Sequence, residues 1–382
     1  MIIRQFKDRD ISLYGMGCMR LPKTNFEDDK SIDEASALEM VDYAYDNGVN
    51  YFDTAYVYHG GLSEPFMGKA LSRYPRESFV LATKFPGYDS SNWGKHEEIF
   101  ANQLERLQTD YVDMYLIHNV CEANIDAYLD SDKYGDVEYF IKLRDQGNKI
   151  KHLGFSVHGS AQVMQRFLDK YGSEMEFVQI QLNFIDYGFQ DAAAKLEIAK
   201  KYDLPVIVME PLRGGSLAKV SDKEAALIEK ACPGMSIVEL AERYIMGFDQ
   251  VFAVLNGASS LDQMKENIEY FQEEKPLTAA EEDVIRQITS MRLDCGIAPC
   301  TACRYCVEHC PQGLDIPLLL ELFNDNKFSG GSWRAPMILA TLDKDKLPKC
   351  CIACGACAEV CPQSIDIPKM LADFSASLDG KF

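Results

Sequence analysis

The chain of 382 residues has no apolar stretch of the roughly eighteen or more residues that a membrane-spanning helix requires. Its N-terminus, MIIRQFKDRD, lacks the long apolar core of a secretory signal peptide. Positive charge is scarce as well, because 39 Lys and Arg face 59 Asp and Glu, which gives a formal net charge of -20. The resulting field would repel nucleic acid and anionic membrane surfaces. We therefore expect a soluble cytoplasmic protein that binds neither nucleic acid nor membranes.

Cysteine is nearly absent from the first three quarters of the chain. Only Cys18, Cys121 and Cys232 occur there, while the other ten of the 13 cysteines follow residue 294. The three early cysteines have no spacing pattern, so we interpret them as small buried side chains without chemistry. The abrupt change in composition predicts a domain boundary, with one domain over residues 1–294 and a second over residues 295–382.

The first domain alternates apolar strand-like runs with helical patterns. A capping box formed by Ser31 and Glu34 predicts a helix that ends before Gly48, and Ser236 with Glu239 predicts the start of another. The eight expected strands are Leu13–Met16, Asn50–Asp53, Phe79–Lys84, Val112–His118, His152–Val157, Phe177–Asn183, Val206–Glu210 and Val251–Leu255. Near-continuous apolar strands that alternate with helices imply parallel strands buried on both faces and joined by right-handed crossovers.

Eight such units predict an α/β fold of the (β/α)8, or TIM barrel, type. A doubly wound open sheet is the main alternative, but no GxGxxG motif follows the first expected strand. Polar residues also occur at strand ends that lie far apart in the sequence, and a barrel would gather those ends around one mouth.

Four titratable residues occur at or just after these strand ends. Asp53 and Tyr58 follow the second strand, Lys84 closes the third and His118 closes the fourth. Each has a plain structural interpretation: a helix cap for Asp53, core packing for Tyr58 or His118, and a solvated charge for Lys84. Their convergence on one rim favours acid–base chemistry instead.

Several segments resemble the aldo/keto reductase superfamily, and the resemblance covers roughly residues 1–294. The matching segments are GMGCMR, DTAYVY, ATK, YLIH, GNKIKHLGFS, VQIQLN and MEPLRGG. The resemblance implies a catalytic tetrad of Asp53, Tyr58, Lys84 and His118, a small carbonyl substrate, and a hydride donor that is NADP(H) or NAD(H). Tyr58 would donate the proton, Lys84 would favour its ionisation, Asp53 would hold Lys84, and His118 would orient the carbonyl.

The resemblance also implies a set of cofactor contacts. A carboxamide would be held by Ser156 and Gln179, and a pyrophosphate would lie near Arg20. The full set is Arg20, Ser156, Gln179, Met209, Pro211, Leu212, Gly257, Gln263, Glu266 and Asn267.

Three positions depart from the family pattern. Val157 replaces the usual asparagine after Ser156, and Met209 replaces the aromatic residue that stacks on the nicotinamide. Gly257 and Gln263 stand where a lysine and an arginine often grip the ribose 2′-phosphate. Without these cations, a preference for NADPH over NADH loses its usual charge-assisted basis, so the choice of nicotinamide stays open.

The second domain contains two complete CxxCxxCxxxCP runs, CTACRYCVEHCP at residues 300–311 and CIACGACAEVCP at 351–362. In two-cluster ferredoxins three cysteines of such a run bind one 4Fe-4S cluster, and the cysteine before proline binds the other. One expected ligand set is Cys300, Cys303, Cys306 and Cys361, and the other is Cys351, Cys354, Cys357 and Cys310. Zinc is the alternative for any CxxC pair, but it does not call for a fourth cysteine before proline.

The two runs belong to an internal repeat, because CPQGLDIPLLL and CPQSIDIPKML lie 51 positions apart. Each copy should end in a helix that begins with Asp and Pro. Further helices are expected at Leu318–Phe323 and Pro336–Leu342, which gives a mainly helical ferredoxin-like domain. Cys295 and Cys350 lie outside the pattern, and we interpret them as ordinary thiols.

A hydride-transfer barrel joined to one-electron carriers leaves three hypotheses open. In the first, the barrel reduces aldehydes or ketones and the two 4Fe-4S clusters exchange electrons with a ferredoxin-like partner. In the second, the clusters are structural or redox-sensing. In the third, the protein is a redox-responsive binding module, since the family fold also serves as channel regulatory subunits. The sequence does not indicate the oligomeric state.

Overall fold

The computed structural model describes residues 1–300, 303–361 and 363–379. The chain divides into two compact units, residues Met1–Ile285 and Arg286–Phe382. The boundary expected after residue 294 stays a prediction. In the part of the chain that is described, no helix combines the length and apolarity needed to cross a membrane.

The first unit is a closed barrel of eight parallel strands, in the order β10-β3-β4-β5-β6-β7-β8-β9. The strands are β3 (Tyr14–Gly17), β4 (Tyr51–Asp53), β5 (Val80–Phe85), β6 (Val112–Val120), β7 (Ile150–Val157), β8 (Val178–Gln181), β9 (Val206–Met209) and β10 (Val251–Asn256). All eight expected strands are present, and no expected bound differs from the observed one by more than two residues. The predicted TIM barrel is therefore confirmed.

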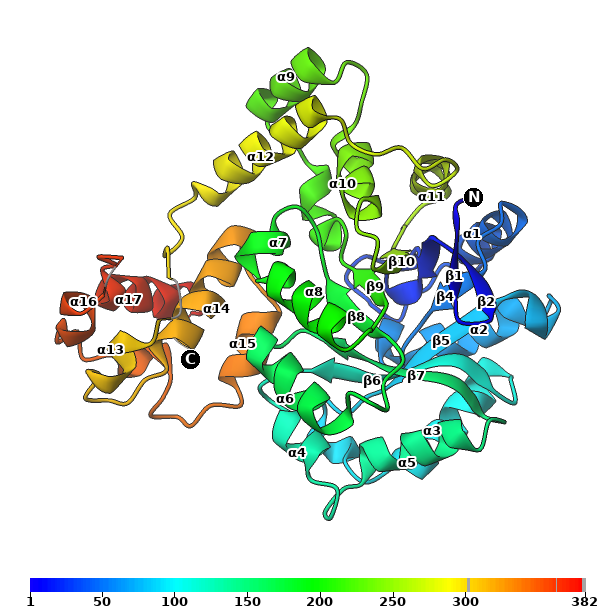
Figure 1. The fold of residues 1–382 in the computed structure, drawn as a ribbon, viewed down its shortest axis with the longest axis horizontal. Helices are drawn as coiled ribbons and strands as arrows, with labels where there is room; N and C mark the ends of the chain where they lie inside the picture. The colour runs from blue at the N-terminus through cyan, green and yellow to red at the C-terminus, as the bar shows by residue number, and fades with distance from the viewer. Residues whose placement is uncertain (301–302, 362, 380–382) are drawn as a thin grey trace. The chain divides into compact units, whose positions relative to one another are not determined.

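Helices surround the barrel strands, as Figure 1 shows for this unit. They are α1 (Glu34–Asp46), α2 (Ser63–Leu71), α3 (His96–Leu107), α4 (Ile125–Leu129), α5 (Asp136–Asp145), α6 (Ala161–Tyr171), α7 (Asp186–Phe189), α8 (Ala192–Lys201), α9 (Asp222–Ala231), α10 (Ile237–Met246) and α11 (Leu261–Tyr270). The next helix, α12 (Ala279–Leu293), contains the boundary between the two units. The expected cap of α10 is present, because the hydroxyl of Ser236 accepts from the N–H of Glu239 at 3.0 Å.

The expected capping box at the start of α1 is wrong. Asp33 is the N-cap, and its carboxylate accepts from the N–H of Ser36 at 3.2 Å. The hydroxyl of Ser31 instead donates to the carbonyl oxygens of Asn25 and Asp28, both at 2.7 Å. Ser31 therefore closes the preceding loop, and a tertiary arrangement outweighs the local sequence signal.

A hairpin that the sequence did not predict closes the end of the barrel where the strands begin. It consists of β1 (Ile3–Phe6) and β2 (Arg9–Ser12), which pair antiparallel. The ring of Phe6 stacks on Phe252 with centroids 4.6 Å apart and meets Phe177 edge-on at 6.0 Å. Phe252 and Phe177 lie at the beginnings of β10 and β8. The other end, where the strands finish, is thus the end left for a site.

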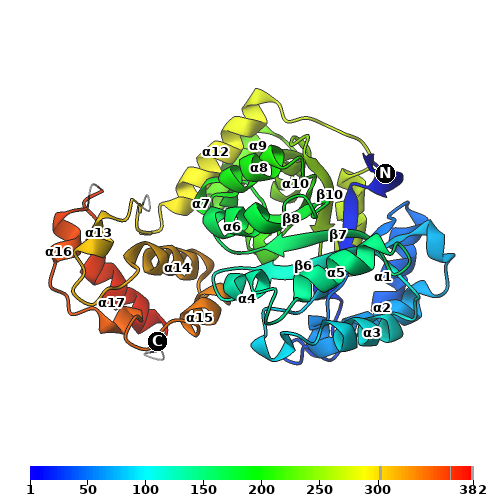
Figure 2. The same ribbon diagram turned by 60° about the horizontal axis from the view of Figure 1, so that its bottom comes forward.

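The second unit is helical and has its own apolar core. Its helices are α13 (Tyr305–Glu308), α14 (Ile316–Ser329), α15 (Arg334–Leu339), α16 (Ala356–Glu359) and α17 (Ile367–Ser377), which Figure 2 shows as one group. Asp315 and Asp366 cap α14 and α17, and a proline follows within the first turn of each, as the repeat predicted. The two helices meet through Phe323 and Phe374, whose ring centroids are 6.0 Å apart.

Candidate functional site

Three of the four expected catalytic residues come from consecutive barrel strands. Asp53 is the last residue of β4, Lys84 is the penultimate residue of β5, and His118 lies near the end of β6. Tyr58 begins η2 (Tyr58–Gly61), a short 3-10 helix just after β4. Because parallel strands finish at the same end of a barrel, the structure brings all four side chains to one rim.

Lys84 is the centre of this group. Its Nζ atom donates to Oδ1 of Asp53 at 2.6 Å, to the carbonyl oxygen of Thr54 at 2.7 Å, and to the hydroxyl of Tyr58 at 3.4 Å. An ammonium group has three donors, so these three acceptors account for all of them. The Lys84 and Asp53 side chains are buried, whereas Tyr58 is half-buried. The buried ion pair therefore fixes a cation beside a half-buried phenol.

The ionisation states follow from burial and charge. Burial lowers the pKa of Lys84, but the charges of Asp53 and Tyr58 more than offset this, so the pKa lies above its usual value. Burial raises the pKa of Tyr58, and the neighbouring ammonium cancels only part of that rise. Lys84 is thus an ammonium and Tyr58 a protonated phenol at neutral pH. This is the state that a proton donor needs before reaction.

His118 lies edge-on to two phenol rings. Its ring centroid is 6.3 Å from that of Tyr58 and 5.2 Å from that of Tyr88. Burial, followed by the charges of Lys84 and His158, lowers the pKa of His118 well below its usual value, so the imidazole is neutral. Its Nδ1 atom is buried and has no hydrogen-bond partner among the described residues. The ring is thus able to present an N–H or a lone pair to a ligand.

The next three strands, β7, β8 and β9, carry the residues expected to hold and cover a carboxamide. The Nε2 atom of Gln179 lies 3.3 Å from the sulfur of Met209, and its Oε1 atom is buried without a partner in the described structure. The Oγ atom of Ser156 accepts from the N–H of Asn119 at 2.8 Å, which leaves its own hydrogen for another acceptor. A carboxamide has both a donor and an acceptor, so the residues present fit a nicotinamide here.

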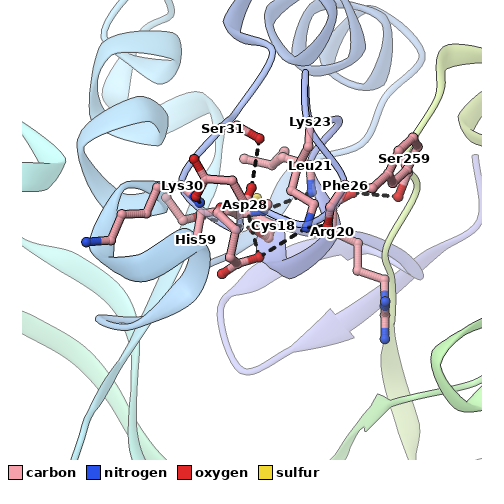
Figure 3. A network of polar contacts seen from close by, with 12 residues as sticks. Cys18, Arg20, Leu21, Lys23, Phe26, Asp28, Lys30, Ser31, His59 and Ser259 are labelled. Atoms are coloured by element: carbon pink, nitrogen blue, oxygen red, sulfur yellow. Dashed lines mark hydrogen bonds and ion pairs between the residues drawn. The ribbon is translucent and has the colours of Figure 1, made fainter.

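Arg20 lies between two loops at the same end of the barrel. The hydroxyl of Ser259 donates to its carbonyl oxygen at 3.0 Å, and Figure 3 shows the guanidinium group extending away from this network. A Cβ atom added at Gly257 would lie 3.2 Å from Cβ of Arg20, and one added at Gly214 would lie 2.8 Å from a guanidinium nitrogen. The loop that contains Gly214 follows β9 and also carries Pro211 and Leu212. The side chain of Arg20 therefore lies against two glycine-containing loops, where an added side chain would crowd it.

The remaining expected cofactor contacts lie on α11. Gln263 is exposed, and its Oε1 atom accepts from the N–H of Ser259 at 2.9 Å. Glu266 is also exposed and accepts from the hydroxyl of Tyr270 at 2.6 Å, whereas Asn267 is buried. The structure thus places Gln263 and Glu266 on the outer surface of this helix and Asn267 beneath it.

Two cavities in the second unit are lined by the two expected cysteine sets. One is lined by Cys300, Cys303, Cys306 and Cys361, and the other by Cys310, Cys351, Cys354 and Cys357. Each encloses about 310 Å³ of empty space, part of which is open to solvent. The fourth cysteine of each run thus lines the cavity of the other run, which is the crossed pattern expected for two clusters.

The donor set of each cavity suits a cluster better than a single ion. Four sulfur atoms around a cavity match a cubane, which has iron at several corners. Thr301, Ala302 and Pro362 belong to the two cysteine runs but lie outside the described residues.

The chain matches two known families. Residues 14–290 match the aldo/keto reductase family, and residues 299–365 match the 4Fe-4S dicluster domain. The first match covers most of the chain, which therefore belongs to the aldo/keto reductase family. The expectations of an NAD(P)H-dependent oxidoreductase and of a second, 4Fe-4S domain are confirmed.

Individual relatives support the same class. The Bacillus subtilis oxidoreductase YqkF is 26% identical to this chain, over 69% of this chain and 88% of its own length. L-galactose dehydrogenase of Arabidopsis thaliana is 28% identical, over 62% of this chain and 77% of its own length. Among solved structures, aldo-keto reductase AKR11C1 from Bacillus halodurans in its holo form is 28% identical, with a TM-score of 0.61. That alignment covers 75% of this chain and 96% of the other.

Sequence reasoning missed two residues that contact the candidate catalytic group. The backbone carbonyl oxygen of Thr54 accepts a hydrogen bond from Lys84. Any residue type could supply this oxygen, so the sequence does not indicate the contact. Tyr88 lies against His118, and its hydroxyl is buried without a partner among the described residues. Its loop follows the strand that carries Lys84, which is the one signal that could have indicated it.

Proposed function

We propose that the barrel reduces an aldehyde or a ketone, with Tyr58 as the proton donor. The observation that carries this proposal is the contact of the Lys84 ammonium with both the Asp53 carboxylate and the Tyr58 hydroxyl. A bound NAD(P)H would supply the hydride to the carbonyl carbon. The carbonyl carbon gains a hydride and the oxygen gains a proton, so the product is an alcohol.

The chain's own residues would manage the proton. The phenol of Tyr58 donates its proton to the substrate oxygen, and the phenolate left behind lies beside the Lys84 ammonium. Asp53 keeps Lys84 charged and in place. His118, neutral and half-buried, donates a second hydrogen bond to the same oxygen and thereby stabilises the developing negative charge.

Several residues would hold the cofactor. Gln179 and Ser156 would bind the carboxamide, and Met209 would pack on the nicotinamide ring in place of an aromatic residue. Arg20 would bind the pyrophosphate between the loops that contain Gly257 and Gly214. Pro211 and Leu212 would line the same passage, while Gln263, Glu266 and Asn267 would lie toward the adenosine end.

The two cysteine-lined cavities would each hold one 4Fe-4S cluster. Such clusters carry single electrons, and we propose that a ferredoxin-like partner exchanges electrons with them. We also propose a cytoplasmic location, because a reducing compartment keeps the ligand thiols available.

Replacing Tyr58 by phenylalanine tests the catalytic part of this proposal. Tyr58→Phe removes the proton donor and keeps the ring, so the turnover of a test aldehyde should fall by a factor of about 10² to 10⁴. Tyr56→Phe is a matched control from the same segment and should leave the turnover unchanged. A Tyr58→Phe variant with full activity would remove Tyr58 from the acid role.

A second experiment tests whether the clusters take part. NADH or NADPH alone is added to protein prepared without oxygen, and the visible absorbance and EPR signal of the clusters are followed. Bleaching shows electron flow from the nicotinamide to the clusters. Unchanged clusters during aldehyde turnover would favour a structural or redox-sensing role and contradict direct coupling.

A further inference from the structure

The two cluster cavities are near copies of one another. Each described residue that lines one cavity has its counterpart, 51 positions away, lining the other, except where that counterpart lies outside the described residues. Gln312 thus corresponds to Gln363, and Pro317 corresponds to Pro368. Two sites with the same ligands and the same apolar walls would give their clusters similar reduction potentials.

One pair of lining residues breaks this equivalence in charge. Arg304 lines the cavity of Cys300, Cys303, Cys306 and Cys361, and its counterpart in the other cavity is Gly355. Arg304 is the one charged side chain among the described residues that line either cavity. The two sites therefore differ by a guanidinium group.

The backbone shows that this position suits glycine better than arginine. Arg304 has a φ of 66° and Gly355 a φ of 82°, so both adopt the left-handed conformation, each just before a short helix. A side chain in this region is uncommon and carries a conformational cost, whereas glycine does not. In the first repeat Arg304 thus adopts a backbone conformation that is unfavourable for arginine, and its cationic side chain lines the cavity.

The carboxylate that pairs with Arg304 has a counterpart in the second repeat. A nitrogen of Arg304 lies 3.1 Å from a carboxylate oxygen of Asp315, and both side chains are largely exposed. Asp366 is the counterpart of Asp315, so each site has this carboxylate and only the first has the arginine. Lys369 follows Pro368 of the other cavity and corresponds to Leu318, but it does not line that cavity. Lys346 is a second cation on that side. It donates to the carbonyl oxygen of Gln312 at 2.8 Å but does not line the cavity.

We propose that Arg304 makes the cluster of Cys300, Cys303, Cys306 and Cys361 the more easily reduced of the two. Reduction adds one electron to a cluster, and a guanidinium group beside it attracts the added negative charge. This cluster then has the more positive reduction potential and holds an electron first. The inference rests on the proposed binding of two 4Fe-4S clusters.

Redox titration of the intact protein, followed by EPR, tests the assignment. The wild type should show two midpoint potentials. Arg304→Gly places the residue of the second repeat in the first and removes the backbone cost. The cluster with the more positive midpoint should then become harder to reduce, with an equilibrium constant for reduction that is lower by about threefold to tenfold. Tenfold corresponds to about 59 mV for a one-electron couple. The more negative midpoint should stay in place, so the two midpoints converge.

The reciprocal change identifies the cluster without a spectral assignment. Gly355→Arg should move the more negative midpoint upward and leave the other unchanged. Arg304→Lys keeps the charge and should retain both midpoints, whereas Lys346→Gln should leave the more positive midpoint in place. Should Gly355→Arg fail to fold, the Arg304 variants decide alone. Arg304→Gly with both midpoints unmoved overturns the inference, and protein that lacks the iron and sulfide of two clusters overturns the proposed cluster binding instead.

Discussion

Lys84 and Asp53 form an ion pair of 2.6 Å inside the barrel, and the same ammonium group lies 3.4 Å from the hydroxyl of Tyr58. One cation therefore neutralises a buried carboxylate and lies beside the phenol that we propose as the proton donor. These two roles are separable by mutation.

Lys84→Met should abolish carbonyl reduction and destabilise the fold. The substitution leaves Asp53 buried without a counter-charge, which costs about 3 to 5 kcal/mol when a buried pair is broken from one side. Lys84→Met combined with Asp53→Asn should recover most of the stability and none of the activity. Urea unfolding and aldehyde turnover measure the two effects. A double variant with wild-type turnover would contradict the role of Lys84 beside Tyr58.

His118 should give no pH dependence near neutrality. Its pKa lies well below the usual value because of burial and the Lys84 charge, so the imidazole stays neutral between about pH 6 and pH 8. The rate of carbonyl reduction should be flat across that range.

His118→Ala removes one donor to the oxyanion and should lower kcat by a factor of about 10² to 10³ at every pH in the range. A wild-type rate that falls with a midpoint near 6.5 would show that His118 titrates.

The sequence was sufficient to predict the barrel and the identity of the residues at its mouth. Apolar runs and strand-end positions are local signals, and Asp53, Lys84 and His118 each close such a run. The hairpin of β1 and β2 was not predictable, because Phe6 gains its burial from residues more than a hundred positions away. The ionisation of Tyr58 also depends on burial in the folded chain, which no sequence pattern reports.

Gln263→Arg should increase the preference for NADPH over NADH. Gln263 is exposed at the start of α11, where a guanidinium group would meet a 2′-phosphate and not a 2′-hydroxyl. A charge-assisted hydrogen bond of this kind is worth about 1.5 to 3 kcal/mol, or at least about tenfold in the KM ratio of the two cofactors.

Glu269→Gln is the matched control for this substitution. It changes the charge of α11 by the same amount near the other end of the helix, and it should leave the KM ratio unchanged. An equal effect of both substitutions would indicate a general field effect in place of direct contact.

Glu176 should stabilise the folded state at mildly acidic pH. Burial raises the pKa of Glu176, but His152 at 2.8 Å and Lys7 at 3.1 Å lower it to about 2. A lowered pKa contributes stability that is present above the unfolded value of 4.5 and is lost as the pH falls toward 2. Glu176→Gln should therefore lower the free energy of unfolding more at pH 5 than near pH 2. Glu197→Gln, at an exposed position, should show no such dependence in urea unfolding.

The proposed function depends on direct delivery of hydride from NAD(P)H to a carbonyl carbon. The most direct test is the reduction of a test aldehyde with NAD(P)H that carries deuterium at the transferable position, followed by mass spectrometry of the alcohol. Direct hydride transfer should place one deuterium on the carbon that was the carbonyl carbon. An alcohol that carries only solvent hydrogen at that carbon would contradict it and would favour reduction by single electrons from the clusters.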